Sequence, residues 1–506
     1  MRRTAVAVTG VGYAIGAFAA GGLSPASASA AGHGLASSHV SRAGSSAIET
    51  RSKQSGPGTA ASGTQTVEYN GYSVTVPASW QVFHLDSDPG QCVRYDINAV
   101  YLGRPGADQN CPANLMGRAE TITITPAGLS GSSPQASGGE QSAAAQGGLV
   151  QSPPPSETGR AISAKASSFS RMSEYSQEHE LRGSVAGSGL SVTATYGSDP
   201  APVTRYLSSL HRARPLRAGA PSGTTAPAPV KSPATTKAPA TTKGPATTTK
   251  TSSTTKTSGT VKPSSTLAST LKPSIPSSPL NGFDTCTAPS LKVMKAWKAK
   301  YSAIGIYIGG QNMACDYGNL SASWVKSAHA LGWSLLPLYV GLQAPCNSFA
   351  DISTTKAVAQ GTQAADTAVG DAANLGLGKG SPVYFDMEGY NNSNSSCRST
   401  VLRFLDAWTH EVHARGYVSG VYSSAASGVS DLVAAGSVNG HLMNKPDAMW
   451  FALWDKKNNL TGTPYLPAKN WTSDRVKQYQ GNQNVKVGGY KLNIDADRVG
   501  GAVSAP

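Results

Sequence analysis

The strongest constraint on the fold of this chain is an alternation of short apolar runs with helical segments between Asn281 and Pro506. Eight of these runs have the composition of strands. This count and the length of the segment predict an α/β fold, specifically a (β/α)8 TIM-like barrel. A doubly wound open sheet is the alternative, but it would need fewer strands and usually a phosphate-binding loop. The predicted strands are Gly282–Asp284, Ile304–Ile308, Leu335–Val340, Val383–Glu388, Tyr417–Tyr422, Met449–Trp454, Val476–Tyr479 and Leu492–Asp495, and the predicted helices are Ser290–Lys300, Ser321–Leu331, Thr354–Leu375 and Thr400–Arg415.

The run from Pro382 to Tyr390 carries two carboxylates within three residues. Side chains of a strand alternate between its faces, so Tyr384, Asp386 and Glu388 share one face and the apolar residues between them share the other. In an α/β barrel, helices cover the outer face of each strand, while the inner face presents catalytic groups at its C-terminal end. The run therefore predicts a barrel strand with a chemically active inner face.

Acidic residues that close three predicted strands point to one pocket. Asp284 ends the first strand, Asp386 and Glu388 end the fourth, and Asp495 ends the last. Glycosidic bond cleavage needs a protonated carboxyl to assist the leaving oxygen, and a charged carboxylate to stabilise the oxocarbenium-like centre or activate water. We therefore predict these four acids as catalytic residues. In a strand, the α-carbons of Asp386 and Glu388 are about 6.5 Å apart. Rotation of the side chains then allows the carboxyl separations of both retaining and inverting glycosidases, so the sequence does not predict the stereochemistry of cleavage.

Aromatic residues within or just after the predicted strands are candidates to stack on sugar rings. The alternative to sugar binding is that each ring packs in the barrel core. For the acids, the alternative to catalysis is that they form ion pairs with Lys or Arg at the barrel mouth. No basic residue lies between Lys379 and Arg398, which weakens a local pairing. The predicted substrate-binding residues are Tyr307, Tyr339, Tyr390, Tyr422, Trp454 and Tyr479.

Residues 281–500 resemble the glycoside-hydrolase-like barrel family of exported actinobacterial proteins. The matching text is GFDTCTAPS from 282, IGIYIGG from 304, LLPLYVGLQAPC from 335, YFDMEGY from 384 and GYVSGVYSS from 416, together with Trp454-Asp455. This family is similar to the family 25 lysozymes, whose barrels carry an Asp on the first strand, an Asp-x-Glu on the fourth and an Asp near the last. The Asp-x-x-Asp-x-Asp-x-Glu run of chitinase-type barrels is missing.

The resemblance implies a role for each acid. Glu388 would be the general acid, and Asp386 would stabilise the charged intermediate or orient an N-acetyl group. Asp284 and Asp495 would position water or sugar. The implied substrate is a β-1,4-linked amino-sugar glycan such as peptidoglycan.

Composition divides the rest of the chain into several segments. Arg2-Arg3, an apolar run and small residues up to Ala30 predict a signal peptide over 1–30, with the export route left open. Residues 31–64 are expected to be disordered. A small α+β domain is predicted over 65–213, with an Asn70-Gly71 hairpin and a low-complexity insert at about 127–157. A disordered Pro/Thr/Lys linker at 214–280 precedes the barrel at 281–506.

The net charge of +14 is concentrated in the linker, because residues 211–280 carry ten Lys or Arg and no acid. Such a tail can contact anionic wall polymer, and a nucleic-acid partner is not expected. After the signal peptide, no run is long enough for a transmembrane span. We expect a secreted, extracellular monomer associated with the cell wall.

Six cysteines in an exported chain predict disulfides rather than a metal site. Cys92 and Cys111 are expected to pair within the small domain. Cys286, Cys315, Cys346 and Cys397 allow three pairings, among which the sequence does not choose. No metal or other cofactor is predicted.

Together these observations predict an exported glycoside-hydrolase-like protein that acts on cell-wall amino-sugar glycan through carboxylate acid/base chemistry. The alternative is a non-catalytic glycan-binding module with a degenerate hydrolase pocket. A structural or adhesive role is a third interpretation.

Overall fold

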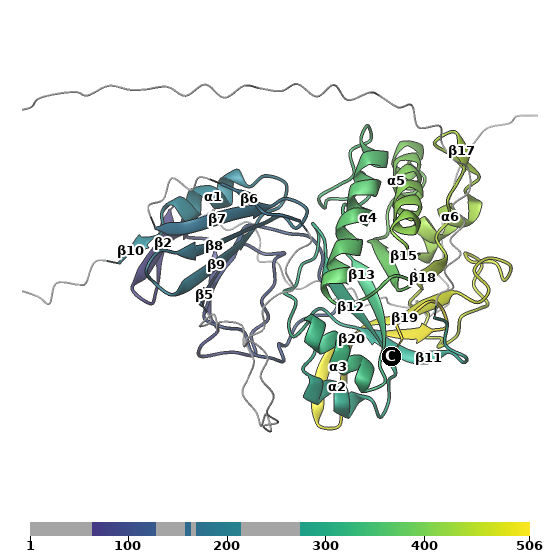
Figure 1. Cartoon of the computed structure of the whole chain (residues 1–506), viewed down its shortest axis with the longest axis horizontal. Coiled ribbons are helices and arrows are strands. Elements are labelled where there is room, and N and C mark those ends of the chain that lie inside the picture. The colour runs from purple at the N-terminus through teal and green to yellow at the C-terminus, as the bar shows by residue number, and fades with distance from the viewer. Residues whose placement is uncertain (1–62, 128–156, 163–167, 214–273, 506) are drawn as a thin grey trace, which may run out of the picture. The chain divides into compact units, whose positions relative to one another are not determined.

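The structure is a computed structural model, and it describes residues 63–127, 157–162, 168–213 and 274–505 (Figure 1). The predictions of a signal peptide, an N-terminal disordered segment, a low-complexity insert and a linker fall almost entirely outside the described residues. All the described residues belong to one compact unit. Among the described residues, no helix is long and apolar enough to cross a membrane.

Eight strands close into a barrel in the C-terminal half, so the predicted strand count is confirmed (Figure 1). From the first strand to the seventh, each strand runs parallel to the next one around the barrel. In barrel order the strands are β11 (Leu280–Asp284), β12 (Ala303–Gly309), β13 (Ser334–Tyr339), β14 (Pro382–Met387), β15 (Val418–Ser424), β18 (Ala448–Ala452), β19 (Arg475–Val487) and β20 (Tyr490–Val499).

The end of the barrel departs from the predicted (β/α)8 pattern. β19 and β20 form an antiparallel hairpin, and β20 also pairs antiparallel with β11. The turn between them is Gly488–Gly489, and both residues have positive φ, which glycine adopts at little cost. A two-residue turn leaves no room for a crossover helix, so the last strand must reverse its direction.

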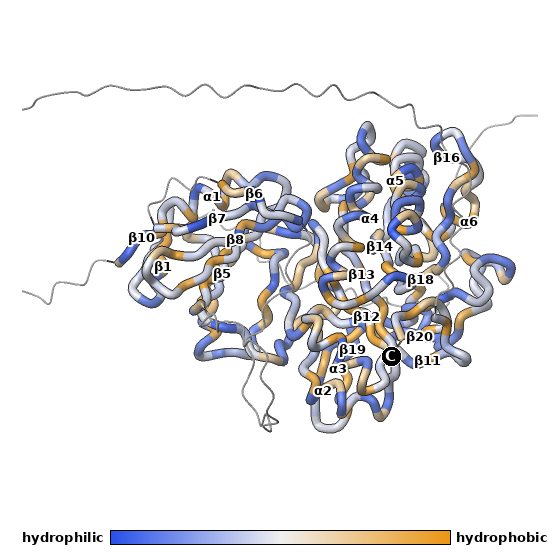
Figure 2. The backbone as a smooth tube through the Cα atoms, viewed as in Figure 1, coloured by the Kyte–Doolittle hydropathy of each residue, from blue (hydrophilic) through white to orange (hydrophobic). Residues whose placement is uncertain are grey.

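Four helices cover the outside of the early strands. They are α2 (Leu291–Trp297), α3 (Ala322–Ala330), α4 (Ala357–Asn374) and α5 (Ser395–Ala414), close to the predicted ranges. Ser290, Ser321 and Asn394 cap the first turns of three of them by accepting a backbone N–H. In Figure 2, apolar residues recur along the barrel strands, while α5 carries polar stretches as well.

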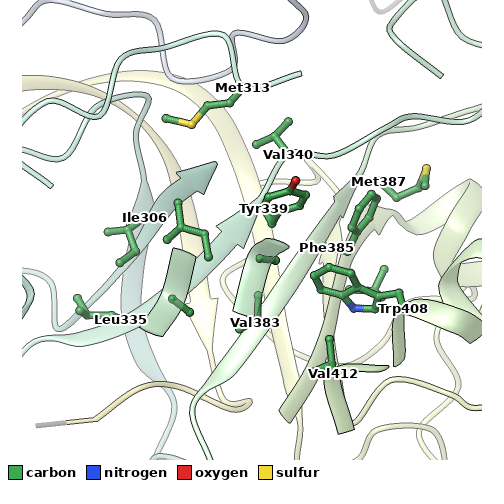
Figure 3. Packing of buried hydrophobic residues seen from close by; sticks show 14 of the residues in the cluster. Ile306, Met313, Leu335, Tyr339, Val340, Val383, Phe385, Met387, Trp408 and Val412 are labelled. Carbon is green, nitrogen blue, oxygen red and sulfur yellow. The ribbon is translucent and has the colours of Figure 1, made fainter. Parts of the chain in front are cut away.

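The barrel strands divide their side chains between two apolar layers. On β14, Val383, Phe385 and Met387 belong to the outer cluster beneath the helices, where Phe385 packs edge-on against Trp408 of α5 (Figure 3). Tyr384 instead belongs to the interior cluster, where its hydroxyl donates to the carbonyl of Ala502 at 2.6 Å. The predicted alternation of β14 is therefore confirmed.

After β15 the chain makes a π-helix η1 (Ala425–Val429), a short helix α6 (Ser430–Ala434) and a small hairpin of β16 (Ser437–Val438) and β17 (His441–Leu442). The π-helix follows directly from the carboxyl end of a barrel strand. Its Ser427 hydroxyl accepts the backbone N–H of Tyr390 at 3.3 Å, which fixes the loop after β14.

The N-terminal module is built mainly from strands, which form two sheets. A seven-stranded sheet has the order β3-β4-β5-β9-β8-β7-β6, and a three-stranded sheet has the order β1-β2-β10. The Asn70-Gly71 hairpin is confirmed, and α1 (Ala201–Ser208) follows the last long strand of the larger sheet. The strands are β1 (Thr64–Tyr69), β2 (Tyr72–Pro77), β3 (Gln81–His84), β4 (Ala99–Leu102), β5 (Thr121–Pro126), β6 (Arg160–Ala161), β7 (Phe169–Tyr175), β8 (Glu180–Val185), β9 (Leu190–Thr195) and β10 (His211–Arg212).

Three disulfides pair the six cysteines. Cys92 bonds Cys111, as predicted, and the two bridges left open are Cys286–Cys315 and Cys346–Cys397. The first two bridges lie together in one buried cluster. This cluster joins the N-terminal module to the loops that follow β11 and β12.

Candidate active site

A pocket of about 230 Å³ lies at the rim where the parallel barrel strands end. Its acidic lining consists of Asp386 within β14, Glu388 just after it and Asp495 within β20. Three of the four predicted catalytic residues therefore line one cavity.

Asp284, the fourth predicted acid, does not line the pocket itself but is hydrogen-bonded to two residues that do, Tyr307 and Gln478. It ends β11 and pairs with Asp495 in the antiparallel register of β11 and β20. Because β20 runs in reverse, its N-terminal half reaches the rim at which the parallel strands end. Asp495 therefore lies next to Asp284. The prediction that Asp495 ends a strand was wrong, because it lies in the middle of β20.

Hydrogen bonds hold the lower carboxylates in place. Asp284 accepts the Tyr307 hydroxyl at 3.1 Å and the Gln478 side-chain amide at 3.0 Å. A fifth acid, Asp497, lies on the same strand as Asp495 and accepts the Trp450 indole N–H at 3.1 Å. Asp284 and Asp497 are each 1% exposed, so these bonds replace water that burial removes.

Burial raises the pKa of every acid in this cluster. It raises the pKa of Glu388 to about 7, with a further contribution from the charge of Asp284 and an opposing one from the Gly389 backbone N–H. Burial and neighbouring acids raise the pKa of Asp495 to about 8, and burial raises that of Asp284 to about 6 against the hydrogen bonds from Gln478 and Tyr307. The pKa of Asp386 is also raised, first by burial and then by the charges of Glu388 and Asp284. Like charges this close cannot all ionise, so the cluster retains protons at neutral pH.

No cation neutralises these acids within the part of the chain that the structure describes. The ion pairs found there involve other carboxylates. One oxygen of Asp386, Oδ1, is buried without a hydrogen-bond partner. The alternative that these acids serve as ion-pair partners at the barrel mouth therefore has no support among the described residues.

Three of the predicted sugar-stacking rings reach the pocket. Tyr307, Tyr422 and Trp454 line it, and Trp454 is 52% exposed. Gln478 connects these rings to the acids, because its amide oxygen accepts the Tyr422 hydroxyl at 3.0 Å and the Trp454 indole N–H at 2.8 Å. Its amide nitrogen donates to Asp284.

The other three predicted rings lie elsewhere. Tyr339 faces the outer layer and stacks on Trp408, because its neighbour Leu338 occupies the inward position of β13. The hydroxyl of Tyr390 donates to Asp431 of α6 at 2.7 Å. Tyr479 follows the inward-facing Gln478 and does not line the pocket. Each of these tyrosines lies near the end of a strand in the sequence. Whether its ring reaches the pocket depends instead on which face of the strand it occupies or on the course of the loop.

Three groups of functional residues were missed by sequence reasoning, and one of them is Gln478. Buried Gln343 accepts the Glu388 backbone N–H at 2.8 Å and donates to the Asp386 carbonyl at 2.8 Å, so it fixes the chain that carries both acids. Asn114, Leu115 and Met116 of the N-terminal module also line the pocket. The alternation of side chains along its strand could have indicated that Gln478 faces inward. No local sequence pattern indicates Gln343 or the segment from Asn114 to Met116.

Comparisons with solved structures give low overall similarity. An uncharacterized protein of B. stearothermophilus is 18% identical, with a TM-score of 0.31, and the match covers 44% of this chain and 95% of that chain. The catalytic domain of endolysin ply40 from bacteriophage P40 of Listeria monocytogenes is 13% identical, with a TM-score of 0.28 and coverage of 44% and 94%. The spore cortex lytic enzyme SleM of Clostridium perfringens is 15% identical, with a TM-score of 0.30 and coverage of 44% and 67%.

No curated protein matches this chain by sequence. A family model matches residues 295–499, which run from α2 to the end of β20 and include all the barrel acids except Asp284. Over these residues, the chain is similar to the family described as Rv2525c-like, glycoside hydrolase-like domain.

Proposed function

We propose that this chain is an exported glycoside hydrolase that cleaves a β-1,4-linked amino-sugar glycan of the cell wall. The observation that carries the proposal is the convergence of Asp386, Glu388 and Asp495 on one pocket above Asp284. Three disulfides favour an oxidising compartment outside the cytoplasm.

Glu388 is the proposed general acid. It is half-buried and lines the pocket, so it can reach a bound glycosidic oxygen. Its pKa of about 7 leaves a large fraction protonated at neutral pH, as the protonation of a leaving group requires. Gln343 holds the backbone at this position and thereby limits the directions that the carboxyl can take.

Asp284 is the group best suited to carry negative charge beneath the sugar. Its pKa of about 6 is below those of Glu388 and Asp495, because Gln478 and Tyr307 donate hydrogen bonds to it. Asp386 stabilises the charged centre when it is ionised, or orients an N-acetyl group by hydrogen bonding. Asp495 positions water or the sugar.

The cluster predicts a narrow bell-shaped dependence of kcat/KM on pH. The rising limb lies near pH 6, where Asp284 gains its charge, and the falling limb lies near pH 7, where Glu388 loses its proton. Initial rates on a soluble glycan fragment between pH 4.5 and pH 9, at about 0.15 M salt, measure the profile. A rate that stays constant from pH 5 to pH 8 contradicts these assignments.

Trp454→Ala is expected to raise KM by about tenfold and to change kcat little, because an exposed ring contributes stacking area in both the ground and transition states. Trp454→Phe should retain most of the affinity, since it keeps a ring. Tyr465→Ala is the matched control, because Tyr465 is an exposed aromatic outside the pocket lining. Equal effects of the two alanine variants on KM would remove Trp454 from the site.

The test of the proposed function is the release of reducing ends from purified cell wall by the full chain, with wall binding measured in parallel. Hydrolysis is the expected result. Binding without release across several amino-sugar glycans would identify a glycan-binding module instead. The exposed Trp454 beside a buried acid cluster is compatible with that second function as well.

A further inference from the structure

The N-terminal module reaches the pocket through a short segment, Ala113–Gly117. Asn114, Leu115 and Met116 of this segment line the same cavity as Glu388. The pocket is therefore built from two parts of the chain that are far apart in sequence.

Hydrogen bonds fix the segment to the barrel at both ends. The backbone N–H of Ala113 donates to the side chain of Asn493 at 2.8 Å. At the other end, the Gly117 N–H donates to the carbonyl of Asn312 at 2.9 Å, and Met116 forms an isolated antiparallel bridge with Met313. A segment held in this way acts as a wall and not as a mobile lid.

The surroundings of the segment are equally fixed. Cys111 precedes it, and the Cys92–Cys111 and Cys286–Cys315 bridges form a buried cluster against which Leu115 packs. Gln109 donates from its amide to both oxygens of Asp316 on the barrel side, at 2.9 and 2.8 Å. Gly117 has a positive φ, and a Cβ there would come within 3.1 Å of the ring of Phe349, so the chain passes close to another residue of the pocket lining.

We propose that Asn114, Leu115 and Met116 form a specificity wall that selects an N-acetylated sugar, an inference that rests on the proposed function of the pocket as a sugar site. The wall offers one exposed amide beside two half-buried apolar side chains. An acetamido group matches this pairing, because its N–H and C=O can bond an amide while its methyl covers apolar surface. A free amine or hydroxyl at the same sugar position has no methyl and leaves the apolar part of the wall uncovered.

The size of the cavity agrees with recognition of a single sugar unit. Its volume of about 230 Å³ is below the roughly 300–1,000 Å³ of pockets that enclose drug-sized ligands. The specificity wall therefore has to distinguish acetylated from non-acetylated sugars by contacts with a single ring. The acetamido group makes up a large part of the surface of that ring.

The experiment compares the affinities of two disaccharides for full-length protein carrying Glu388→Gln, which is expected to slow turnover during the titration. The probes are the β-1,4-linked disaccharide of N-acetylglucosamine and its deacetylated counterpart. Without further changes, the acetylated probe should bind at least tenfold more tightly. Asn114→Ala should weaken its binding about tenfold and leave the deacetylated probe within about twofold.

Two controls keep the outcome interpretable. Asn110→Ala removes an exposed asparagine from the same loop that does not line the pocket, and it should change neither affinity. Met116→Ala should reduce the preference for the acetylated probe, and its thermal unfolding midpoint reports whether the module stays folded. Equal binding of both probes, or a preference unchanged by Asn114→Ala and Met116→Ala, overturns the wall proposal while leaving the hydrolase proposal standing. Absence of binding by either probe contradicts the sugar site itself.

Discussion

Glu388→Gln is expected to lower kcat on cell-wall glycan by roughly 10²- to 10⁴-fold, the contribution typical of a general acid. Glutamine has nearly the same shape but carries no acidic proton, so the leaving oxygen would have to depart unassisted. The backbone at this position is held by Gln343 through its N–H, and the substitution leaves that bond in place. Binding to wall and the thermal unfolding midpoint should therefore stay close to those of the unmodified chain.

The measurement is single-turnover release of reducing ends at saturating protein, which separates chemistry from binding. Glu68→Gln is the matched control, since Glu68 is an exposed glutamate on β1 of the N-terminal module. Turnover by the Glu388 variant at more than about a tenth of the normal rate would assign the acid role to another group. Asp495 would be the next candidate, because its pKa of about 8 keeps it protonated at neutral pH.

The barrel could be predicted because its signal is local. Each strand of the parallel part is a short apolar run, and on β14 the side-chain alternation alone separates Asp386 from Phe385. The reversal of the last strand also had a local signal in Gly488–Gly489, a dipeptide typical of two-residue hairpin turns. The predicted strands Val476–Tyr479 and Leu492–Asp495 stopped short of this turn, so the hairpin between them was missed.

The site was only partly predictable because many of its contacts join residues that are far apart in the sequence. Strand ends bring the acids together, which sequence order can indicate. Tyr339 shows the limit of that reasoning, since a shift of one position along β13 exchanges a pocket residue for a core residue. The contact of Asn114 with a pocket built by residues after Ala303 depends on how two modules pack, and no periodicity within either module encodes it.

Packing of the N-terminal module on the barrel depends on a buried charge cluster. The Arg118 side chain is 1% exposed, pairs with Glu180 at 2.9 Å and donates to the carbonyl of Met313 on the barrel at 2.9 Å. Glu178 lies in the same cluster and accepts the Gly310 backbone N–H at 3.1 Å and the Tyr317 hydroxyl at 3.2 Å. Burial raises the pKa of Glu178 to about 7, while Arg118 opposes that rise.

Arg118→Met is expected to lower the free energy of unfolding by about 3–5 kcal/mol, because it leaves buried carboxylates without their common cation. Arg182 still pairs with Glu180 at 2.7 Å, which favours the lower end of this range. The loss should be larger at pH 8 than at pH 5. The folded-state pKa of Glu178 lies above its unfolded value, so its contribution to stability is present at low pH and lost as pH rises through about 7, and removing Arg118 raises that pKa further.

Denaturant unfolding followed by tryptophan fluorescence at pH 5 and pH 8 measures both effects. Arg160→Met is the matched control, because Arg160 is 78% exposed and its pair with Glu174 should contribute less than about 1 kcal/mol. The specificity wall adjoins Arg118 in the chain, so the Arg118 variant should also lose the preference for N-acetylated sugar under conditions where the barrel remains folded. A midpoint within the range of the Arg160 control at both pH values would show that the charge cluster does not hold the module in place.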